Sequence, residues 1–266
     1  SGLVSSTLNA GKGNDEINIS VEAAGAKSSG YYSQESKGAY EYSSYYGSGY
    51  YNNWSYDYEH SWDNSGYGVA IGAQDSIIKL GKGSDKLTIN AVSDGINGAI
   101  ALENSIVKGG SGSDKIYLYG DIYNSKIYLG SGDDLIRIEG GGESRVKGGS
   151  GKDRLYGGNG EDSLYGGKSD DILFGGNGND WLFGGVGNDQ LYGGDGEDIF
   201  TVKKGYGRSL IKDFEDGLDK IFIGTGISKT KITTRNDDAF IRQGSDLLAI
   251  IKNAAGDLTQ DGSYFV

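Results

Sequence analysis

The sequence contains no cysteine, no proline and no methionine among its 266 residues, and it has one histidine. Without cysteine there is no disulfide framework and no thiolate metal site, and soft metals lack their usual ligands. The absence of proline keeps every backbone N–H available, which suits a chain with many tight turns. The absence of methionine, including at position 1, indicates a fragment or a processed chain.

The sequence also lacks a long hydrophobic run and a recognisable catalytic motif. No segment is long and apolar enough to span a membrane, and no signal peptide is visible. H-E-x-x-H, G-x-S-x-G and P-loop patterns are absent, so we expect no enzyme. The formal charge of −12 argues against nucleic acid as a partner, because phosphate binding favours a basic face.

Glycine is abundant, with 49 residues, and aspartate recurs at fixed intervals. Six tandem copies of G-G-x-G-x-D-x-U-x, in which U is apolar, cover residues 148–201. The glycine half predicts a turn with positive φ, and the last three residues predict a short strand with U pointing inward. The U positions are Leu155, Leu164, Leu173, Leu182, Leu191 and Phe200.

Two successive copies predict one flattened coil, because a single copy cannot bury its apolar residue alone. Copies of the same parity then stack along one edge, so that Asp153, Asp171 and Asp189 form one column. The opposite column is formed by Asp162, Asp180 and Asp198. Carboxylates stacked about 4.8 Å apart repel one another. Calcium removes this conflict, since it accepts about six to eight oxygens, backbone carbonyls included.

The nonapeptide resembles that of the RTX (repeats-in-toxin) family, whose calcium-binding repeats form a right-handed parallel β-roll. The resemblance implies an all-β solenoid in which one coil supplies its aspartate and the carbonyls of its second and fourth positions. The next coil supplies its aspartate and the carbonyls of its first and third positions. One ion would lie among Gly149, Gly151, Asp153, Gly166, Lys168 and Asp171. Another would lie among Gly158, Gly160, Asp162, Gly175, Asn177 and Asp180.

A third ion would use Ser169, where the family has glycine. Carried over to the other copies, the resemblance implies several Ca²⁺ ions. The further ligands that it implies are Asp85, Gly110, Gly112, Asp114, Gly130, Gly132, Asp134, Gly148, Ser150, Gly178, Gly184, Val186, Asp189, Gly193, Asp195 and Asp198.

Diluted copies occur upstream, at Ala10, Leu80, Gly109 and Leu129. Steps of 19 or 20 residues correspond to one coil with a residue or two added, so Asp114, Asp134 and Asp153 are expected to continue one column. On the opposite edge a second signature replaces the motif: "DSIIKL", "NSIVKG", "NSKIYL" and "ESRVKG". These segments predict strands whose core residues are Ile77, Ile106, Ile127 and Val146. We therefore expect calcium along one edge throughout, and along both edges only in the C-terminal half.

A tyrosine-rich insertion, expected as a loop at about 22–69, interrupts the degenerate coils of residues 1–147. Its segment Tyr31–Tyr67 holds 11 of the 20 tyrosines and the single histidine, His60. Tyrosine, serine, glycine and asparagine are typical of adaptable recognition surfaces. Three interpretations stay open: a contact for self-association, a glycan-binding loop that uses Trp54 and Trp62, or a flexible insertion without a partner.

Residues 202–266 are expected to form a C-terminal β cap, because a solenoid needs its open end covered. Their "DF-x-x-G-x-D-x-I" segment is similar to the region that follows RTX repeats, and an apolar C-terminus there is read by a one-step (type I) secretion apparatus. Asp213, Asp216 and Asp219 either close a last calcium site or are turn residues.

The leading hypothesis is a secreted calcium-binding structural protein that self-associates into, or decorates, a cell-surface layer or filament. The alternatives are the export-and-folding tail of a larger RTX exoenzyme or toxin, and a glycan-binding adhesin.

Overall fold

The computed structural model divides the chain into two compact units, Ser1–Arg145 (unit 1) and Val146–Val266 (unit 2), and each is described by itself. The described residues form strands and turns and no helix, so none of them belongs to a helix suited to crossing a membrane. The structure describes residues 3–23, 27–28, 30–34, 39–44, 47–52, 62–63, 71–93, 99–223, 230–254, 258, 260–261 and 264–265. For residues 22–63 within these ranges, and for 93, 260 and 261, only the backbone is described.

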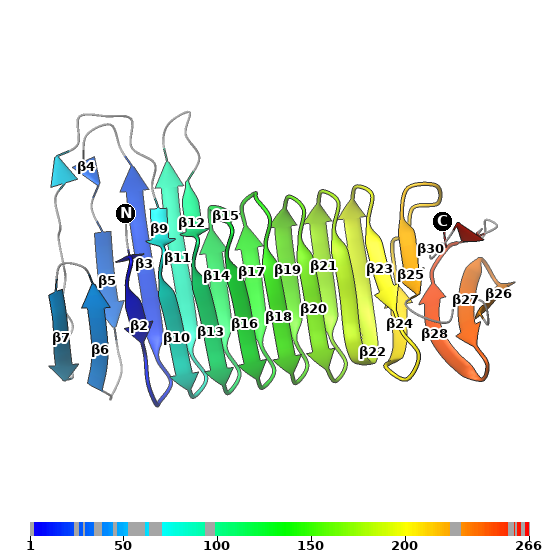
Figure 1. Ribbon diagram of the computed structural model, residues 1–266, viewed down its shortest axis with the longest axis horizontal. Coiled ribbons are helices and arrows are strands. Elements are labelled where there is room, and N and C mark those ends of the chain that lie inside the picture. Colours follow the sequence, from blue (N-terminus) through cyan, green and yellow to red (C-terminus); the bar gives the residue numbers. More distant parts are fainter. Residues whose placement is uncertain are drawn as a thin grey trace. The chain divides into compact units, whose positions relative to one another are not determined.

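Unit 1 is a stack of coils that each contribute three strands (Figure 1). The strands of the successive coils are β1 (Leu3–Val4), β2 (Thr7–Asn9) and β3 (Glu16–Ala23); β9 (Ile71–Gln74), β10 (Ile77–Lys82) and β11 (Lys86–Ser93); β12 (Ile100–Glu103), β13 (Ile106–Ser111) and β14 (Lys115–Tyr119); and β15 (Asp121–Tyr123), β16 (Lys126–Ser131) and β17 (Leu135–Glu139). Equivalent strands of neighbouring coils pair in parallel. We call β2, β10, β13 and β16 layer 1, and β3, β11, β14 and β17 layer 2. This arrangement confirms the all-β parallel roll.

The tyrosine-rich segment contains strands where a loop was expected. They are β4 (Lys27–Ser28), β5 (Gly30–Gln34), β6 (Ala39–Ser44), β7 (Gly47–Asn52) and β8 (Trp62–Asp63). β5 pairs antiparallel with β3, and β6 pairs antiparallel with β2, so the segment extends both layers beyond the first coil. Tyrosine favours strands, and an open end of a solenoid needs covering. Trp54 and His60 lie outside the described residues.

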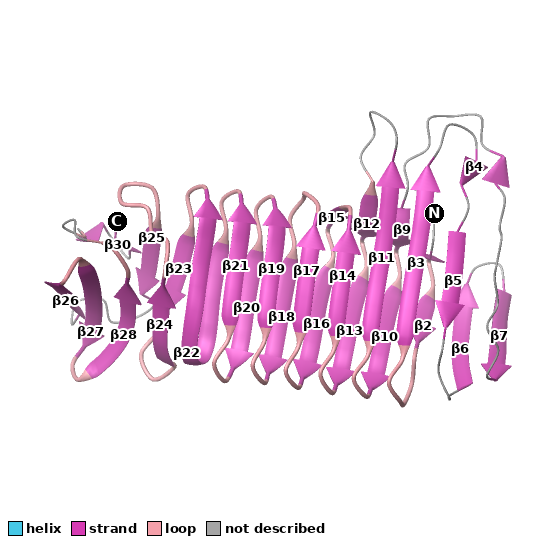
Figure 2. Cartoon of the chain, turned by 180° about the vertical axis from the view of Figure 1, so that it is seen from behind, coloured by secondary structure: helices cyan, strands magenta, loops and turns pink. Residues whose placement is uncertain are grey.

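Unit 2 contains the regular repeats and the C-terminal strands (Figure 2). Its strands are β18 (Arg145–Ser150), β19 (Arg154–Asn159), β20 (Ser163–Lys168), β21 (Ile172–Asn177), β22 (Trp181–Asp195), β23 (Ile199–Val202), β24 (Gly207–Ile211), β25 (Lys220–Ile223), β26 (Thr230–Arg235), β27 (Asp238–Gln243), β28 (Asp246–Ile251), β29 (Gln260–Asp261) and β30 (Tyr264–Phe265). β24 and β25 continue the parallel pairing of the repeats. Beyond them, β26, β27 and β28 form an antiparallel meander, and β30 pairs antiparallel with β25.

In the tandem repeats the core is a row of single apolar side chains, one for each copy, whereas several strands of unit 1 bury two or more. All six U residues of the tandem repeats are at most 2% exposed. In unit 1 the prediction for the serine-containing strands was wrong by one residue at two places. Ile77 and Ile106 point outward and are partly exposed, while Ile78 and Val107 are fully buried. Ile127 and Val146 are buried as expected.

Candidate calcium-binding edges

The turn at each motif is built from glycines that no other residue replaces without strain. The second and fourth positions have positive φ, for example +118° at Gly149 and +120° at Gly151. A Cβ on Gly167 would overlap the carbonyl oxygen of Gly149 in the preceding coil. Glycine is therefore required both for the backbone conformation and for the close stacking of coils. Ser169 adopts φ +82° at a fourth position, where the other tandem copies have glycine, so the backbone of that copy is strained.

A ladder of aspartates links successive coils of unit 2. The backbone N–H of each aspartate donates to the Oδ1 of the aspartate one coil later. The donor–acceptor distances are 2.9 Å from Asp153 to Asp171 and 3.0 Å from Asp171 to Asp189. On the opposite edge they are 2.8 Å both from Asp162 to Asp180 and from Asp180 to Asp198. These are the two columns that the repeat arithmetic predicts.

The other carboxylate oxygen of the ladder faces a space that suits a cation. In six aspartates the Oδ2 atom is buried and makes no hydrogen bond with the described residues: Asp85, Asp114, Asp171, Asp180, Asp189 and Asp198. A Cβ on Gly175 would overlap Asp180 Oδ2 and crowd the carbonyl oxygen of Gly193 in the next coil. Carboxylate and carbonyl oxygens therefore converge on a small space that glycine leaves open. Hard oxygen donors of this kind are what Ca²⁺ takes, so the residues fit calcium.

Backbone carbonyl oxygens would have to supply most of the ligands of each calcium ion. Among the described residues, no group of three or more Asp, Glu, His or Cys side chains gathers closely enough to hold a metal by itself. The resemblance implied this balance, with one carboxylate from each of two coils and four carbonyls. The exact ligand set predicted for each ion stays a prediction.

Burial raises the pKa of four aspartates in these columns. Loss of hydration raises the pKa of Asp171 and of Asp180 to about 8, and repulsion by neighbouring aspartates adds to the effect. The same cause raises the pKa of Asp198 to about 7 and that of Asp189 to about 6. Hydrogen bonds from the preceding coil's N–H act in the opposite direction. A divalent cation between coils would stabilise the ionised form.

Unit 1 carries one acidic ladder. Asp15 N–H donates to Asp85 Oδ1 at 2.7 Å, and the chain of contacts continues from Asp85 to Asp114 at 2.8 Å and from Asp114 to Asp134 at 2.7 Å. Asp15 belongs to this ladder although the predicted ligands begin at Asp85. The step from Asp134 to Asp153 joins the two units and stays a prediction.

The first position of the motif separates three of the four unit 1 copies, which begin at Ala10, Leu80 and Leu129, from the tandem repeats; the copy that begins at Gly109 keeps glycine there. Leu80 and Leu129 are fully buried where each tandem copy has glycine, so an apolar side chain accompanies the acidic ladder. The unit 1 sites are therefore less like the tandem sites, and calcium there stays a prediction.

The opposite edge of unit 1 is closed by serines. Ser6 N–H donates to Ser76 Oγ at 3.2 Å, Ser76 N–H to Ser105 Oγ at 3.0 Å, and Ser105 N–H to Ser125 Oγ at 3.0 Å. Each hydroxyl in turn donates to the carbonyl two residues earlier, as Ser76 does to Gln74 at 2.6 Å. Serine thus occupies the place of the motif aspartate, and its hydroxyl both accepts and donates a hydrogen bond within the protein.

The serine ladder could have been predicted from a spacing in the sequence. Each serine lies two residues before a buried apolar residue, the spacing of Asp to U in the motif. Aligning serine with aspartate would have placed Ile78 and Val107 in the core instead of Ile77 and Ile106.

The C-terminal segment extends one acidic column by a further step. Asp198 N–H donates to Asp219 Oδ1 at 2.9 Å, and Asp219 Oδ2 accepts a 2.8 Å bond from the N–H of Glu215. Asp213 Oδ1 accepts a bond from Gly193 N–H at 2.9 Å. Asp216 is exposed in the turn. Asp219 and Asp213 are therefore built into the roll, and Asp216 is a turn residue.

Parallel coils joined by buried carboxylate ladders and glycine turns define a β-roll whose edges fit calcium. The particular family follows from residues 138–173, 147–182 and 174–206, which match the family described as RTX calcium-binding nonapeptide repeat (4 copies). This region of the chain belongs to that family, and its several repeats bind several Ca²⁺ ions.

Solved structures include similar chains, one of them the extracellular lipase LipA from Serratia marcescens. The two sequences are 17% identical, the TM-score is 0.32, and the match covers 72% of this chain. It covers 36% of the lipase, so this chain corresponds to about a third of that protein. None of the curated proteins matches the chain.

Proposed function

We propose that the chain is a secreted, calcium-folded structural protein that forms or decorates a cell-surface layer or filament through self-association. The observation that carries this proposal is the pair of buried carboxylate columns in unit 2. In four of their members, Asp171, Asp180, Asp189 and Asp198, the Oδ2 atom has no hydrogen-bond partner among the described residues. Such columns oppose folding until a divalent cation is present. A chain of this kind stays loose where calcium is scarce and folds where calcium is plentiful, as it is outside the cell.

The chain's own residues determine what calcium does when it binds. Bound calcium supplies positive charge and draws oxygen ligands from two coils together, so that binding free energy becomes folding free energy. The glycine turns orient the carbonyls toward the edge, and the inward apolar residues exclude water from the core. The aspartate ladder holds each carboxylate in register with the next.

Exposed apolar side chains on unit 2 support the self-association part of the proposal. Trp181 is 51% exposed and Val186 is 44% exposed, both on β22. Exposed apolar patches often mark contact sites. Trp181 also donates a hydrogen bond from Nε1 to Thr201 Oγ1 at 2.6 Å. Another outward aromatic, Phe174, stacks between Tyr156 and Tyr192, with ring centroids 4.6 and 4.4 Å away.

The test combines folding and assembly. Circular dichroism of metal-free protein should show a coil-to-β transition on calcium addition, while magnesium at equal concentration should not produce it. Electron microscopy of the calcium-loaded chain should then show ordered polymers or sheets. A calcium-folded protein that stays monomeric at high concentration would contradict self-association but leave calcium-driven folding intact.

Trp181→Ser and Val186→Ser make a matched test of the contact surface. Both side chains are exposed, so the substitutions should weaken assembly without changing the calcium-induced β signal. The matched control is Tyr128→Ser, which also removes an exposed aromatic on an outward face and should leave assembly unchanged. Loss of the β signal in the first two variants would show that they disturb folding instead of contact.

We further propose that the chain has no catalytic role of its own, which the lack of catalytic motifs supports. Two alternative roles, an export-and-folding module and a glycan-binding adhesin, can each be tested directly. A catalytic or pore-forming domain encoded in the same gene would identify the chain as an export-and-folding module. Saturable binding of neutral sugars that is lost with Trp54→Ala and Trp62→Ala would favour an adhesin.

A further inference from the structure

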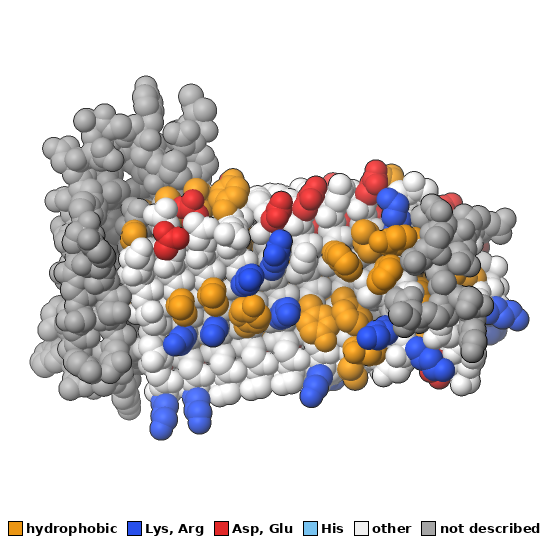
Figure 3. All heavy atoms as spheres, in the orientation of Figure 1, with side chains coloured by type: hydrophobic (Ala, Val, Ile, Leu, Met, Phe, Trp, Pro, Cys, Tyr) orange, Lys and Arg blue, Asp and Glu red, His pale blue; other side chains and the backbone are white. Residues whose placement is uncertain are grey.

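Unit 1 presents a row of cations on layer 1, although the whole chain carries a net charge of −12. The outward positions of β10 and β13 include Lys79 and Lys108, which are adjacent in the parallel register. The next strand, β16, presents Lys126 in a second row, in register with Ile106, and Arg145 lies one coil later in the chain. All four side chains are exposed. Figure 3 shows Lys and Arg side chains gathered in rows over these strands.

These four cations have no acidic partner among the described residues. The ion pairs of unit 1 lie elsewhere, at Lys86–Glu16 and Arg137–Glu139. The outward positions of β2, β10, β13 and β16 contain no aspartate or glutamate. Lys79 and Lys108 lie side by side on neighbouring strands, and like charges at this spacing destabilise a sheet. A positively charged surface that the described side chains do not neutralise is suited to an external anion.

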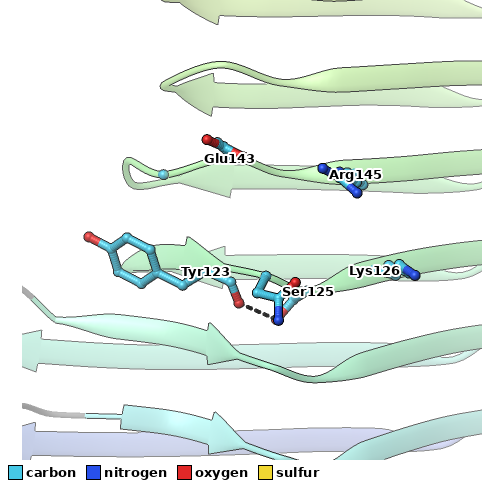
Figure 4. Close-up of a pocket in the computed structure, with 7 residues that line it drawn as sticks. Tyr123, Ser125, Lys126, Glu143 and Arg145 are labelled. Atoms are coloured by element: carbon cyan, nitrogen blue, oxygen red, sulfur yellow. Dashed lines mark hydrogen bonds between the residues drawn. The ribbon is translucent and has the colours of Figure 1, made fainter.

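Exposed tyrosines lie beside the cations. Tyr128 is in register with Lys108 on the neighbouring strand and is 37% exposed. Tyr123 is 46% exposed and lines a pocket together with Lys126, Arg145 and the one acidic lining residue, Glu143. Its hydroxyl donates to Asp121 Oδ2 at 3.3 Å. The pocket forms because the next turn is Gly140–Gly142, which has no side chains to fill it. Figure 4 shows Lys126 and Arg145 on neighbouring strands, and Tyr123 toward the turn.

We propose that a surface of unit 1 binds an acidic polysaccharide; it consists of Lys79, Lys108, Lys126 and Tyr128 on layer 1, with Tyr123 of β15 and Arg145 beside them. Lys79 and Lys108 lie one strand spacing, about 4.8 Å, apart, and Lys126 and Arg145 lie on neighbouring strands. Such pairs of cations match a linear polymer whose carboxylate or sulfate groups recur along its length. Arginine and lysine donate charge-assisted hydrogen bonds to such groups. The tyrosine rings offer flat apolar area to the faces of sugar rings, as aromatic side chains do in recognition surfaces.

This surface includes no predicted calcium ligand and no residue of the tyrosine-rich segment, and the inference does not require self-association. The acidic remainder of the protein repels a polyanion, which restricts binding to the surface where cations gather. Binding should therefore be weakened by salt, since the interaction is between exposed charges.

The experiment uses the full calcium-loaded chain and hyaluronan oligosaccharides, with neutral dextran of equal length as a second probe. Hyaluronan should bind and dextran should not. Lys79→Gln with Lys108→Gln should lower the hyaluronan affinity about tenfold or more, and Lys126→Gln with Arg145→Gln should have a similar effect. The dependence of log affinity on log salt should become shallower by about one to two for each double variant.

The matched control is Lys86→Gln with Lys115→Gln, which removes the same charge from two register neighbours on layer 2. It should change hyaluronan affinity less than twofold. The proposal is overturned if the control loses as much affinity as the layer 1 variants, if the layer 1 variants bind like the parent chain, or if dextran binds equally well. Equal binding of single-stranded DNA with the same dependence on the variants would exclude a polysaccharide-specific surface. Unchanged circular dichroism confirms that each variant is folded.

Discussion

The backbone N–H of Ser105 donates a 3.0 Å hydrogen bond to the hydroxyl of Ser125, one coil further along the chain. On the opposite edge of the same coils, the backbone N–H of Asp114 donates to Asp134 Oδ1 at 2.7 Å. Serine and aspartate therefore make the same link between coils, but only aspartate brings a charge. The serine edge of unit 1 is therefore complete without metal, and calcium at the acidic edge stays a prediction.

Removing one hydroxyl of the serine ladder should destabilise unit 1 regardless of calcium. Ser105→Ala leaves the buried N–H of Ser76 without its acceptor, which costs about 1–3 kcal/mol. Denaturant unfolding followed by circular dichroism should show this loss at saturating and at low calcium alike. Ser131→Ala, at an exposed position, is the control and should have little effect. A loss that appears only with calcium would contradict a metal-free edge.

Neutralising one ladder aspartate should separate its structural role from its electrostatic role. In Asp180→Asn the amide oxygen can still accept the N–H of Asp162, while the buried charge is gone. We expect the metal-free protein to gain β structure and calcium affinity to fall, as measured by circular dichroism and calorimetric titration.

Asp195→Asn is the control for that variant, because only the carbonyl of Asp195 is a predicted ligand and its side chain is exposed. Its calcium affinity should be unchanged. Equal losses in the two variants would show that the predicted division between side-chain and carbonyl ligands is wrong.

Filling the space beside one carboxylate should block calcium at that position. Gly175→Ala places a methyl group against Asp180 Oδ2 and the carbonyl of Gly193, where the φ angle itself imposes no requirement for glycine. We expect fewer calcium ions bound per chain in a calcium titration. Gly217→Ala is the control: φ is +80° there and no atom lies within 4 Å of the added methyl, so it costs only about 1 kcal/mol of backbone strain.

The tandem repeats could be predicted from the sequence because the glycine pair, the aspartate and the apolar residue recur at the same positions of every nine-residue copy. Asp180 and Leu182 are buried for the same reasons as their counterparts 18 residues away. The serine ladder was harder, since a serine is common and only its distance from Ile78 distinguishes it. Because Ile77 and Ile78 are adjacent and both apolar, either could point into the core. The hydrogen bonds of Ser76 fix the strand so that Ile78 is the buried one. The strands of the tyrosine-rich segment have no repeat to reveal them.

Asp219 should determine whether the end of unit 2 remains closed. Its carboxylate accepts the N–H groups of Asp198 and Glu215, and bonds to a charged acceptor contribute about 1.5–3 kcal/mol each. Asp219→Ala should therefore increase hydrogen exchange in residues 207–223 with calcium present. Asp216→Ala, in the exposed turn, should not. Unchanged exchange in Asp219→Ala would show that the cap is held by other contacts, such as Phe214 against Phe200.

Acid should favour the folded state when calcium is absent. Burial raises the pKa of Asp171 and Asp180 from 3.8 to about 8, so between these values the folded state binds protons that the unfolded chain releases. The stabilisation is therefore present at low pH and is lost as the pH rises through about 8. Metal-free protein, prepared by dialysis, should show more β signal by circular dichroism at about pH 5 than at about pH 8.5. With saturating calcium the signal should persist at about pH 8.5, because the ion stabilises the ionised carboxylates. Asp171→Asn combined with Asp180→Asn should flatten the metal-free profile, and greater β content at high pH without calcium would contradict the electrostatic account.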